Sequence, residues 1–106
     1  MDISEFDAVV AALPGVRRRT QDGLWRWQCR GRLLARQLDD SSVVVRVPFD
    51  VRDLLLRESP DVFRVPTRFA KHMMVVADLT ADDRGAVEDA VLAAWRLQTT
   101  DGSTAG

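Results

Sequence analysis

The stretch from residue 25 to residue 47 constrains the fold more than any other part of this 106-residue chain. Large apolar residues alternate with polar ones over 25–29, and a run of β-branched residues over 43–47 ends at Pro48. Alternation is the period of a strand with one buried face, and β-branched residues favour strands. A third short segment, 33–38, lies between them. Connections this short join antiparallel neighbours, so the stretch predicts an antiparallel meander.

Two tight turns separate these segments. Arg30-Gly31-Arg32 contains a glycine, and Asp39-Asp40-Ser41-Ser42 consists of turn-forming residues. Before Val16 the apolar residues recur at helical spacing, and from Val16 onward the spacing changes to that of strands. We therefore expect three or four strands in this part of the chain.

Helical spacing occurs on both sides of the meander. The first helix is expected over about residues 3–13, because its apolar residues form one stripe that ends before Pro14-Gly15: Ile3, Phe6, Val10 and Leu13. A second, short helix is expected to begin with Asp50 as its cap and to end at Ser59-Pro60. Its apolar side is expected to be Val51, Leu54 and Leu55.

The longest helix is expected near the C-terminus. Thr80-Ala81-Asp82-Asp83 resembles a capping box with aspartate in place of glutamate. The packing stripe of the helix that follows is formed by Val87, Val91, Ala94 and Trp95, and the polar tail begins after Leu97. Residues 99–106 are polar and small, so we expect a disordered tail. Residues 1–98 would then form one domain.

Two extended segments, 61–65 and 72–78, separate the second helix from the third. The predicted order is a helix, three or four strands, a helix, two strands and a helix. This order predicts an α+β fold, in which helices pack on one face of an antiparallel sheet.

Composition excludes several kinds of site. Cys29 and His72 are the only cysteine and histidine, so the chain cannot supply the four nitrogen or sulfur ligands of a structural zinc. Neither residue lies in a catalytic motif, and no Gly-rich phosphate loop is present. We expect no enzyme activity, no metal and no cofactor. The acidic N-terminus and the lack of a long apolar run predict a cytoplasmic protein without a membrane segment.

Positive charge is concentrated in one part of the chain. The sequence has 15 basic and 16 acidic residues, yet residues 17–36 contain seven arginines and only Asp22 against them: Arg17, Arg18, Arg19, Arg26, Arg30, Arg32 and Arg36. Arg64, Arg68 and Lys71 form a second, smaller group. Guanidinium groups suit phosphate oxygens, so these residues are candidates for binding DNA. The alternative interpretation is a solvated face, rich in arginine through codon bias and neutralised by nearby aspartates.

Several short motifs, in this order, resemble the MmcQ/YjbR family over about residues 6–97. They are Ala12-Leu13-Pro14-Gly15-Val16, Gly23 with Trp27, Arg30-Gly31-Arg32, Val45-Arg46-Val47-Pro48, Phe63-Arg64 with Pro66, and Trp95-Arg96-Leu97. The resemblance implies a YjbR-like fold, similar to that of type III secretion chaperones and described as a double wing, with DNA binding and no catalytic residues. The chain departs from the family pattern where Asp22 and Met73 replace tryptophans.

A second interpretation is an interaction module that binds a protein or a small apolar ligand and no nucleic acid. Aromatic and thioether side chains suit apolar ligands, and five of them could line a pocket: Trp25, Trp27, Met73, Met74 and Trp95. The same residues are also the large side chains that a core of this size would use. The sequence leaves both interpretations open, with DNA binding as the leading hypothesis.

Overall fold

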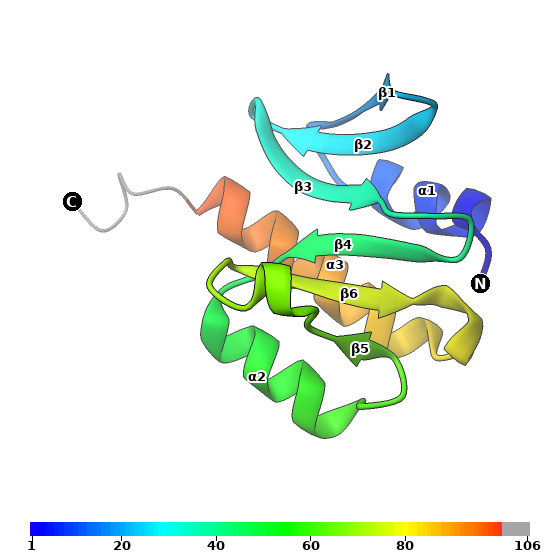
Figure 1. The fold of residues 1–106 in the computed structure, drawn as a ribbon. Helices are drawn as coiled ribbons and strands as arrows, with labels where there is room; N and C mark the ends of the chain where they lie inside the picture. Colours follow the sequence, from blue (N-terminus) through cyan, green and yellow to red (C-terminus); the bar gives the residue numbers. More distant parts are fainter. Residues whose placement is uncertain (101–106) are drawn as a thin grey trace.

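A computed structural model describes residues 1–100 and shows three α-helices against a six-stranded antiparallel sheet (Figure 1). The helices are α1 Ile3–Ala11, α2 Phe49–Glu58 and α3 Arg84–Thr99. The strands are β1 Val16–Gln21, β2 Leu24–Cys29, β3 Arg32–Gln37, β4 Ser42–Arg46, β5 Phe63–Arg64 and β6 Met74–Asp78. Two short 3₁₀ helices, η1 Thr67–Phe69 and η2 Leu79–Ala81, flank β6. The α+β fold class and the order of elements are confirmed.

The meander is confirmed with four strands, and two-residue turns join the first three. Asp22-Gly23 connects β1 to β2, and Arg30-Gly31 connects β2 to β3, each with two consecutive positive φ angles: 55° and 79°, then 56° and 75°. This is the pattern of a type I′ turn, whose twist matches that of the flanking strands. In space the strands follow the order β1-β2-β3-β4-β6-β5, which leaves β1 and the short β5 at the two edges.

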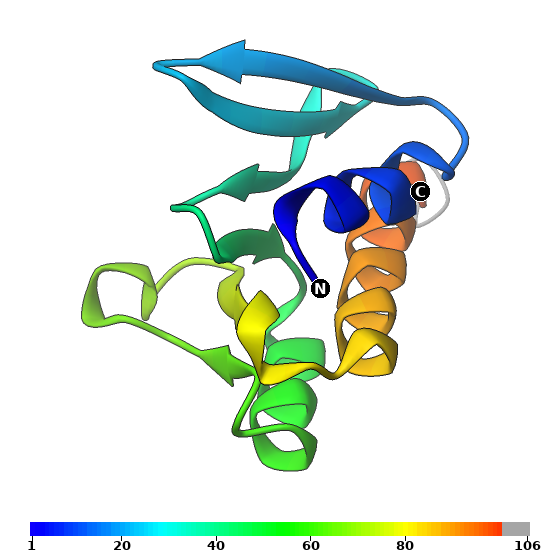
Figure 2. The ribbon, with the colours of Figure 1, turned by 90° about the vertical axis from the view of Figure 1, so that its right-hand side faces the viewer.

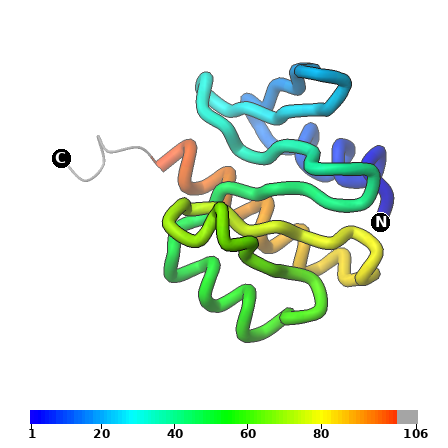
Figure 3. The backbone as a smooth tube through the Cα atoms, viewed as in Figure 1, coloured from blue at the N-terminus to red at the C-terminus, as the bar shows by residue number. Residues whose placement is uncertain are grey.

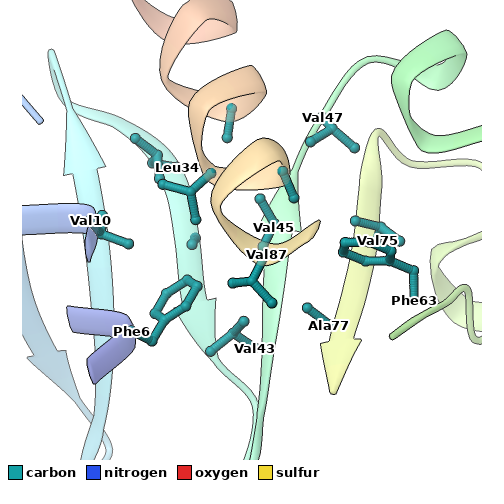
Figure 4. Close-up of a cluster of buried hydrophobic side chains, with 14 of the residues drawn as sticks. Phe6, Val10, Leu34, Val43, Val45, Val47, Phe63, Val75, Ala77 and Val87 are labelled. Atoms are coloured by element: carbon teal, nitrogen blue, oxygen red, sulfur yellow. The ribbon is translucent and has the colours of Figure 1, made fainter. Parts of the chain in front are cut away.

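All three helices contribute to one buried cluster on a single face of the sheet. Figure 2 shows α1 and α3 on the same side of the sheet. Figure 4 shows Phe6 and Val10 of α1 and Val87 of α3 meeting the inward side chains of β4 and β6. Leu55 of α2 joins the same cluster. We call this face the helix face and the opposite one the outer face.

The outer face has only a small apolar cluster. Val44 and Val76 lie side by side in β4 and β6, and Phe69 of η1 covers them. Most of the outer face therefore remains uncovered by any helix.

Helix α1 is shorter than expected, and two expectations for α2 are wrong. Helix α1 ends at Ala11, two residues before Leu13, and its N-terminus is closed by a capping box between Asp2 and Glu5. Asp50 does not cap α2, because the N-cap is Pro48 and Asp50 lies in the first turn. Leu54 is 43% exposed, since the buried side of α2 is centred on Leu55.

Helix α3 begins later and ends later than expected. Its N-cap is Asp83, whose side chain accepts a hydrogen bond from the backbone N–H of Ala86, whereas Thr80 lies in η2. The helix continues through Thr99, one residue beyond the boundary expected after residue 98. The expectation for residues 101–106 concerns a segment outside the described residues. Within residues 1–100, no helix is both long enough and apolar enough to cross a bilayer.

Candidate nucleic-acid interface

Three of the predicted arginines line up across the outer face. In the strand register Arg19 of β1 is opposite Arg26 of β2, and Arg26 is opposite Arg36 of β3. Directly opposed residues of an antiparallel pair have side chains on the same face, with Cβ atoms about 5 Å apart. We call Arg19, Arg26 and Arg36 the arginine row. The row continues into the apolar pair Val44 and Val76, so its cations end beside the outer-face cluster.

The centre of this charge is Arg36. Burial lowers the pKa of the Arg36 guanidinium below its usual value, and the positive charges of Arg68 and Arg26 lower it further. Arg36 lies over the ring of Phe69, with its guanidinium carbon 5.6 Å from the ring centre, and Arg68 lies over the same ring at 4.7 Å. Both contacts are cation–π interactions. Phe69 therefore holds two cations of distant segments close together.

Carboxylates do not neutralise this centre directly. No ion pair between residues 1–100 involves Arg26, Arg36 or Arg68, so these three have no carboxylate partner within ion-pair distance in the described part of the chain. Arg26 instead donates a hydrogen bond from Nη1 to the side-chain oxygen of Gln21 at 2.8 Å. Like charges placed together without counter-charges repel each other, and an anionic ligand would relieve that repulsion.

Two further arginines share the outer face. Arg17 is two residues before Arg19 in β1 and points to the same side. Arg64 of β5 is opposite Val76 at the far edge of the sheet. Asp78 lies near Arg64, and its pKa is lowered mainly by hydrogen bonds from Thr80 and to a smaller extent by that arginine. Of the predicted DNA-binding residues, the outer face thus carries Arg17, Arg19, Arg26, Arg36, Arg64 and Arg68. Arg46 of β4, which is opposite Met74, is a further arginine at an outer-face position.

The other three arginines of the first group lie elsewhere. Arg18 is on the helix face, where its Nη1 is 2.7 Å from Asp7 and its guanidinium carbon is 4.0 Å from the ring centre of Trp25. Arg30 donates a hydrogen bond to the carbonyl oxygen of Thr99 at the end of α3. Arg32 lines a cavity beside α3. The arginines that form one cluster in the sequence therefore lie in different places in the structure, because neighbouring strand positions face opposite sides of the sheet.

Lys71 lies in the segment that follows η1, and α2 anchors this segment. The Arg52 guanidinium donates to three backbone carbonyl oxygens, those of Phe69, Ala70 and His72, at 2.8 to 3.3 Å. This clasp fixes the backbone at Phe69 and therefore also restricts the position of Arg68, the residue directly before it. Neither Arg52 nor Phe69 is among the site residues expected from the sequence, because no local pattern marks either of them.

Two segments project on the outer side of the sheet. In Figure 2 the β1–β2 hairpin and the loop that contains η1 both extend away from α1 and α3, one at each end of the sheet. Figure 3 shows that the middle strands, β3 and β4, run between them. The arginine row starts on the first projection, and Arg68 belongs to the second. The outer face therefore presents cations from two projections and from the sheet between them.

The five candidate pocket residues do not line one cavity. Trp27 is fully buried, with its ring centre 5.0 Å from that of Phe6, while Trp25 is half-buried beside it. Met74 belongs to the outer-face cluster, and Met73 lines the cavity beside α3. The indole Nε1 of Trp95 donates to the carbonyl oxygen of Pro14 at 2.9 Å. Core packing accounts for Trp27, and the other four lie in four separate places.

Cys29 and His72 do not form a site together. Cys29 is 2% exposed and packs in the main cluster, whereas His72 is exposed in the loop before β6. Within residues 1–100, no three side chains of histidine, cysteine, aspartate or glutamate are grouped as a metal site requires.

Comparisons of this chain with models of protein families, with curated proteins and with solved structures found no match in any of the three.

Proposed function

We propose that this protein binds duplex DNA through the outer face of its sheet, as a non-enzymatic protein of the MmcQ/YjbR type. The observation that carries the proposal is the arginine row beside Arg68, a group of cations without a carboxylate partner among residues 1–100. Guanidinium groups bind phosphate oxygens with two parallel hydrogen bonds, and DNA presents such oxygens at regular intervals.

The arrangement favours contacts with the DNA backbone over reading of bases. All three α-helices contribute to the cluster on the helix face, so none lies on the basic outer face as a recognition helix would. Phosphate contacts position a protein on DNA and carry no sequence information directly. We therefore expect modest affinity that depends little on sequence and strongly on salt.

A titration of labelled duplex DNA at several salt concentrations tests the proposal. If three to five phosphates are contacted at once, the logarithm of the association constant falls with the logarithm of salt concentration with a slope of about −3 to −4.5. Affinity should then drop roughly 60- to 500-fold between 50 mM and 200 mM salt. An absence of binding to any duplex at about 100 μM protein and low salt would overturn the proposal.

A pair of charge-matched variants locates the interface. Replacing Arg19 and Arg26 together by glutamine should make the salt slope less steep by up to about two units, because two phosphate contacts are lost. Replacing Arg57 and Arg96 by glutamine removes the same charge from exposed positions on α2 and α3 and should leave the slope unchanged. Equal effects of the two variants would show that net charge, and not the arginine row, governs binding.

The open edge at β1 supports a second candidate, binding of an extended peptide as an additional strand. Five of the six residues of β1 are exposed, and the strand pairs on one side only. Backbone hydrogen bonds to an added strand supply affinity that is less sensitive to salt than phosphate contacts are. The consecutive Arg17, Arg18 and Arg19 would oppose a second copy of the same basic strand and favour an acidic segment.

A further inference from the structure

A cavity of about 440 Å³ lies at one end of the sheet, away from the arginine row. Here β3 begins, β4 ends and α3 reaches its C-terminal turns, at the left of the sheet in Figure 1. The lining residues are Arg32, Leu33, Arg46, Met73, Leu97 and Gln98. This volume is toward the lower end of the range of small-molecule sites, so a fitting ligand is small.

The cavity exists because β3 and β4 separate. Their paired residues run only from Ala35 opposite Val45 to Gln37 opposite Val43, and a bulge between Trp27 and Gln28 shifts the register of β2 against β3. Beyond this pairing, the backbone N–H of Val47 donates to the carbonyl oxygen of Met73. The space between the two strand ends is therefore set by the backbone.

Helix α3 closes this gap with a polar side chain. Gln98 is 3% exposed, and its Nε2 donates to the carbonyl oxygen of Leu33 at 3.0 Å. This bond ties the C-terminal part of α3 to the backbone of β3 beside the cavity. An amide nitrogen has two protons, and this bond uses only one of them.

The walls of the cavity combine apolar surface with positive charge. Leu33, Met73 and Leu97 provide apolar side chains from three segments. Arg32 and Arg46 are the charged residues of the lining, and within the part of the chain that the structure describes neither forms an ion pair. An inorganic anion would leave the apolar walls without a partner, and an uncharged apolar ligand would leave both guanidinium groups without one.

We propose that this cavity binds a small amphipathic carboxylate. The guanidinium groups of Arg32 and Arg46 bind the carboxylate, and the apolar chain of the ligand packs on Leu33, Met73 and Leu97. Arg46 is opposite Met74 at the end of β4, on the same side of the sheet as Val44, but neither Arg32 nor Arg46 belongs to the arginine row. The test of this site needs no nucleic acid.

Titration with hexanoate, followed by NMR of the full chain, tests this site. We expect saturable shifts of the Met73 methyl and the Gln98 side-chain amide, with a Kd at or below about 1 mM. Hexan-1-ol has the same chain without the charge and should bind at least tenfold more weakly. Inorganic phosphate has charge without the chain and should give no saturable shift of the Met73 methyl.

Matched variants separate the site from the general charge of the protein. Arg46→Gln should weaken hexanoate binding about tenfold, which corresponds to the loss of one charge-assisted contact. Arg57→Gln, an exposed position on α2, should leave the Kd unchanged. The spectrum of each variant without ligand verifies that the fold is intact.

Three results would overturn the proposal. One is equal affinity for hexanoate and hexan-1-ol, and another is saturation of the Met73 shift by phosphate alone. The third is a set of hexanoate shifts that does not include Met73 and Gln98. Loss of DNA binding in the Arg19 and Arg26 variant would not affect any of these measurements, so the two proposals can fail separately.

Discussion

At the scale of single residues, Asp7 joins three elements. Its Oδ1 accepts a hydrogen bond from the indole Nε1 of Trp27 at 2.8 Å, and its Oδ2 accepts one from Arg18 at 2.7 Å. One carboxylate on α1 therefore satisfies the polar atom of a fully buried tryptophan on β2 and fixes an arginine on β1. A buried indole N–H without a partner would carry a desolvation penalty, which this contact avoids.

The two tryptophans with polar partners should differ in their contribution to stability. Trp27→Ala should lower the free energy of unfolding by about 3 to 5 kcal/mol, because the removed side chain is fully buried. Trp95→Ala should cost roughly half as much, since Trp95 is only half-buried. Urea denaturation of both variants measures this, and a larger loss for Trp95→Ala would contradict the burial of the two side chains.

Asp39 predicts a specific dependence of stability on pH. The pKa of its carboxyl is below the usual value, mainly through a hydrogen bond from the backbone N–H of Ser41 and then one from the Ser42 hydroxyl. A lowered pKa in the folded state stabilises the fold above the unfolded pKa of about 3.9, and this contribution is lost as pH falls through the folded value. The free-energy difference between wild type and Asp39→Asn should therefore shrink below about pH 4.

Denaturation at several pH values from neutral to acid measures that difference. The corresponding substitution Asp40→Asn is a suitable control, because Asp40 is an exposed neighbour in the same turn. A difference for Asp39→Asn that stays constant down to pH 2 would contradict the expected loss of charge.

At the scale of elements, the clasp of Arg52 ties α2 to the segment from Phe69 to His72. Arg52→Ala should lower the free energy of unfolding by about 2 to 4 kcal/mol, because three carbonyl oxygens lose a charged donor. Amide hydrogen exchange in 67–73 should become faster, while exchange in the β1–β2 hairpin should not change.

Arg52→Lys should restore only part of the stability, because an ammonium group cannot reproduce the planar fork of the guanidinium. The Nε of Arg52 is buried without a hydrogen-bond partner among the described residues, so some of the desolvation cost of this side chain is not compensated. Unchanged exchange in 67–73 after Arg52→Ala would show that other contacts hold the segment.

The β1–β2 hairpin should be sensitive to substitution of its glycine. Gly23 has a φ of 79°, and a Cβ there would meet no atom within 4 Å, so the cost of Gly23→Ala is conformational and should be about 1 kcal/mol. Gly85→Ala is the matched control, because Gly85 lies in the first turn of α3 with ordinary packing space. It should stabilise the protein by about 0.5 to 1 kcal/mol. Equal effects of both substitutions on the denaturation midpoint would contradict the turn assignment.

At the scale of the whole molecule, one cluster connects the hairpin, the central strands and all three helices. The radius of gyration is 12.9 Å, close to about 13 Å for a compact chain of this length. Because Trp27 of β2 and Val91 of α3 belong to the same cluster, the hairpin has no separate core of its own.

Unfolding should therefore be a single cooperative transition. In a Trp95→Phe variant the remaining tryptophans, Trp25 and Trp27, report on β2, while far-UV circular dichroism reports mainly on the helices. The two signals should give the same urea midpoint, as two-state unfolding requires. A fluorescence midpoint at clearly lower urea would show that the hairpin unfolds by itself.

Local sequence patterns determined the elements and the burial of several residues. Alternation over 25–29 correctly placed Trp27 and Cys29 in the core, and the turn residues correctly placed the antiparallel strands. Such patterns succeed because the two-residue period of a strand and the conformational demands of a tight turn involve only neighbours in the chain. Capping was less predictable: Asp83 caps α3 in place of Thr80, because η2 occupies the preceding residues.

Only the tertiary structure decided which charges act together. The arginines at 17–36 form one run in the sequence, yet strand register places Arg19, Arg26 and Arg36 in a row and places Arg18 on the opposite face. Arg68 joins the row through Phe69, which comes from a distant segment. The cavity near Gln98 depends on a bulge and on the separation of β3 from β4. Register and strand separation result from packing of the whole sheet against its helices, so no local pattern contains them.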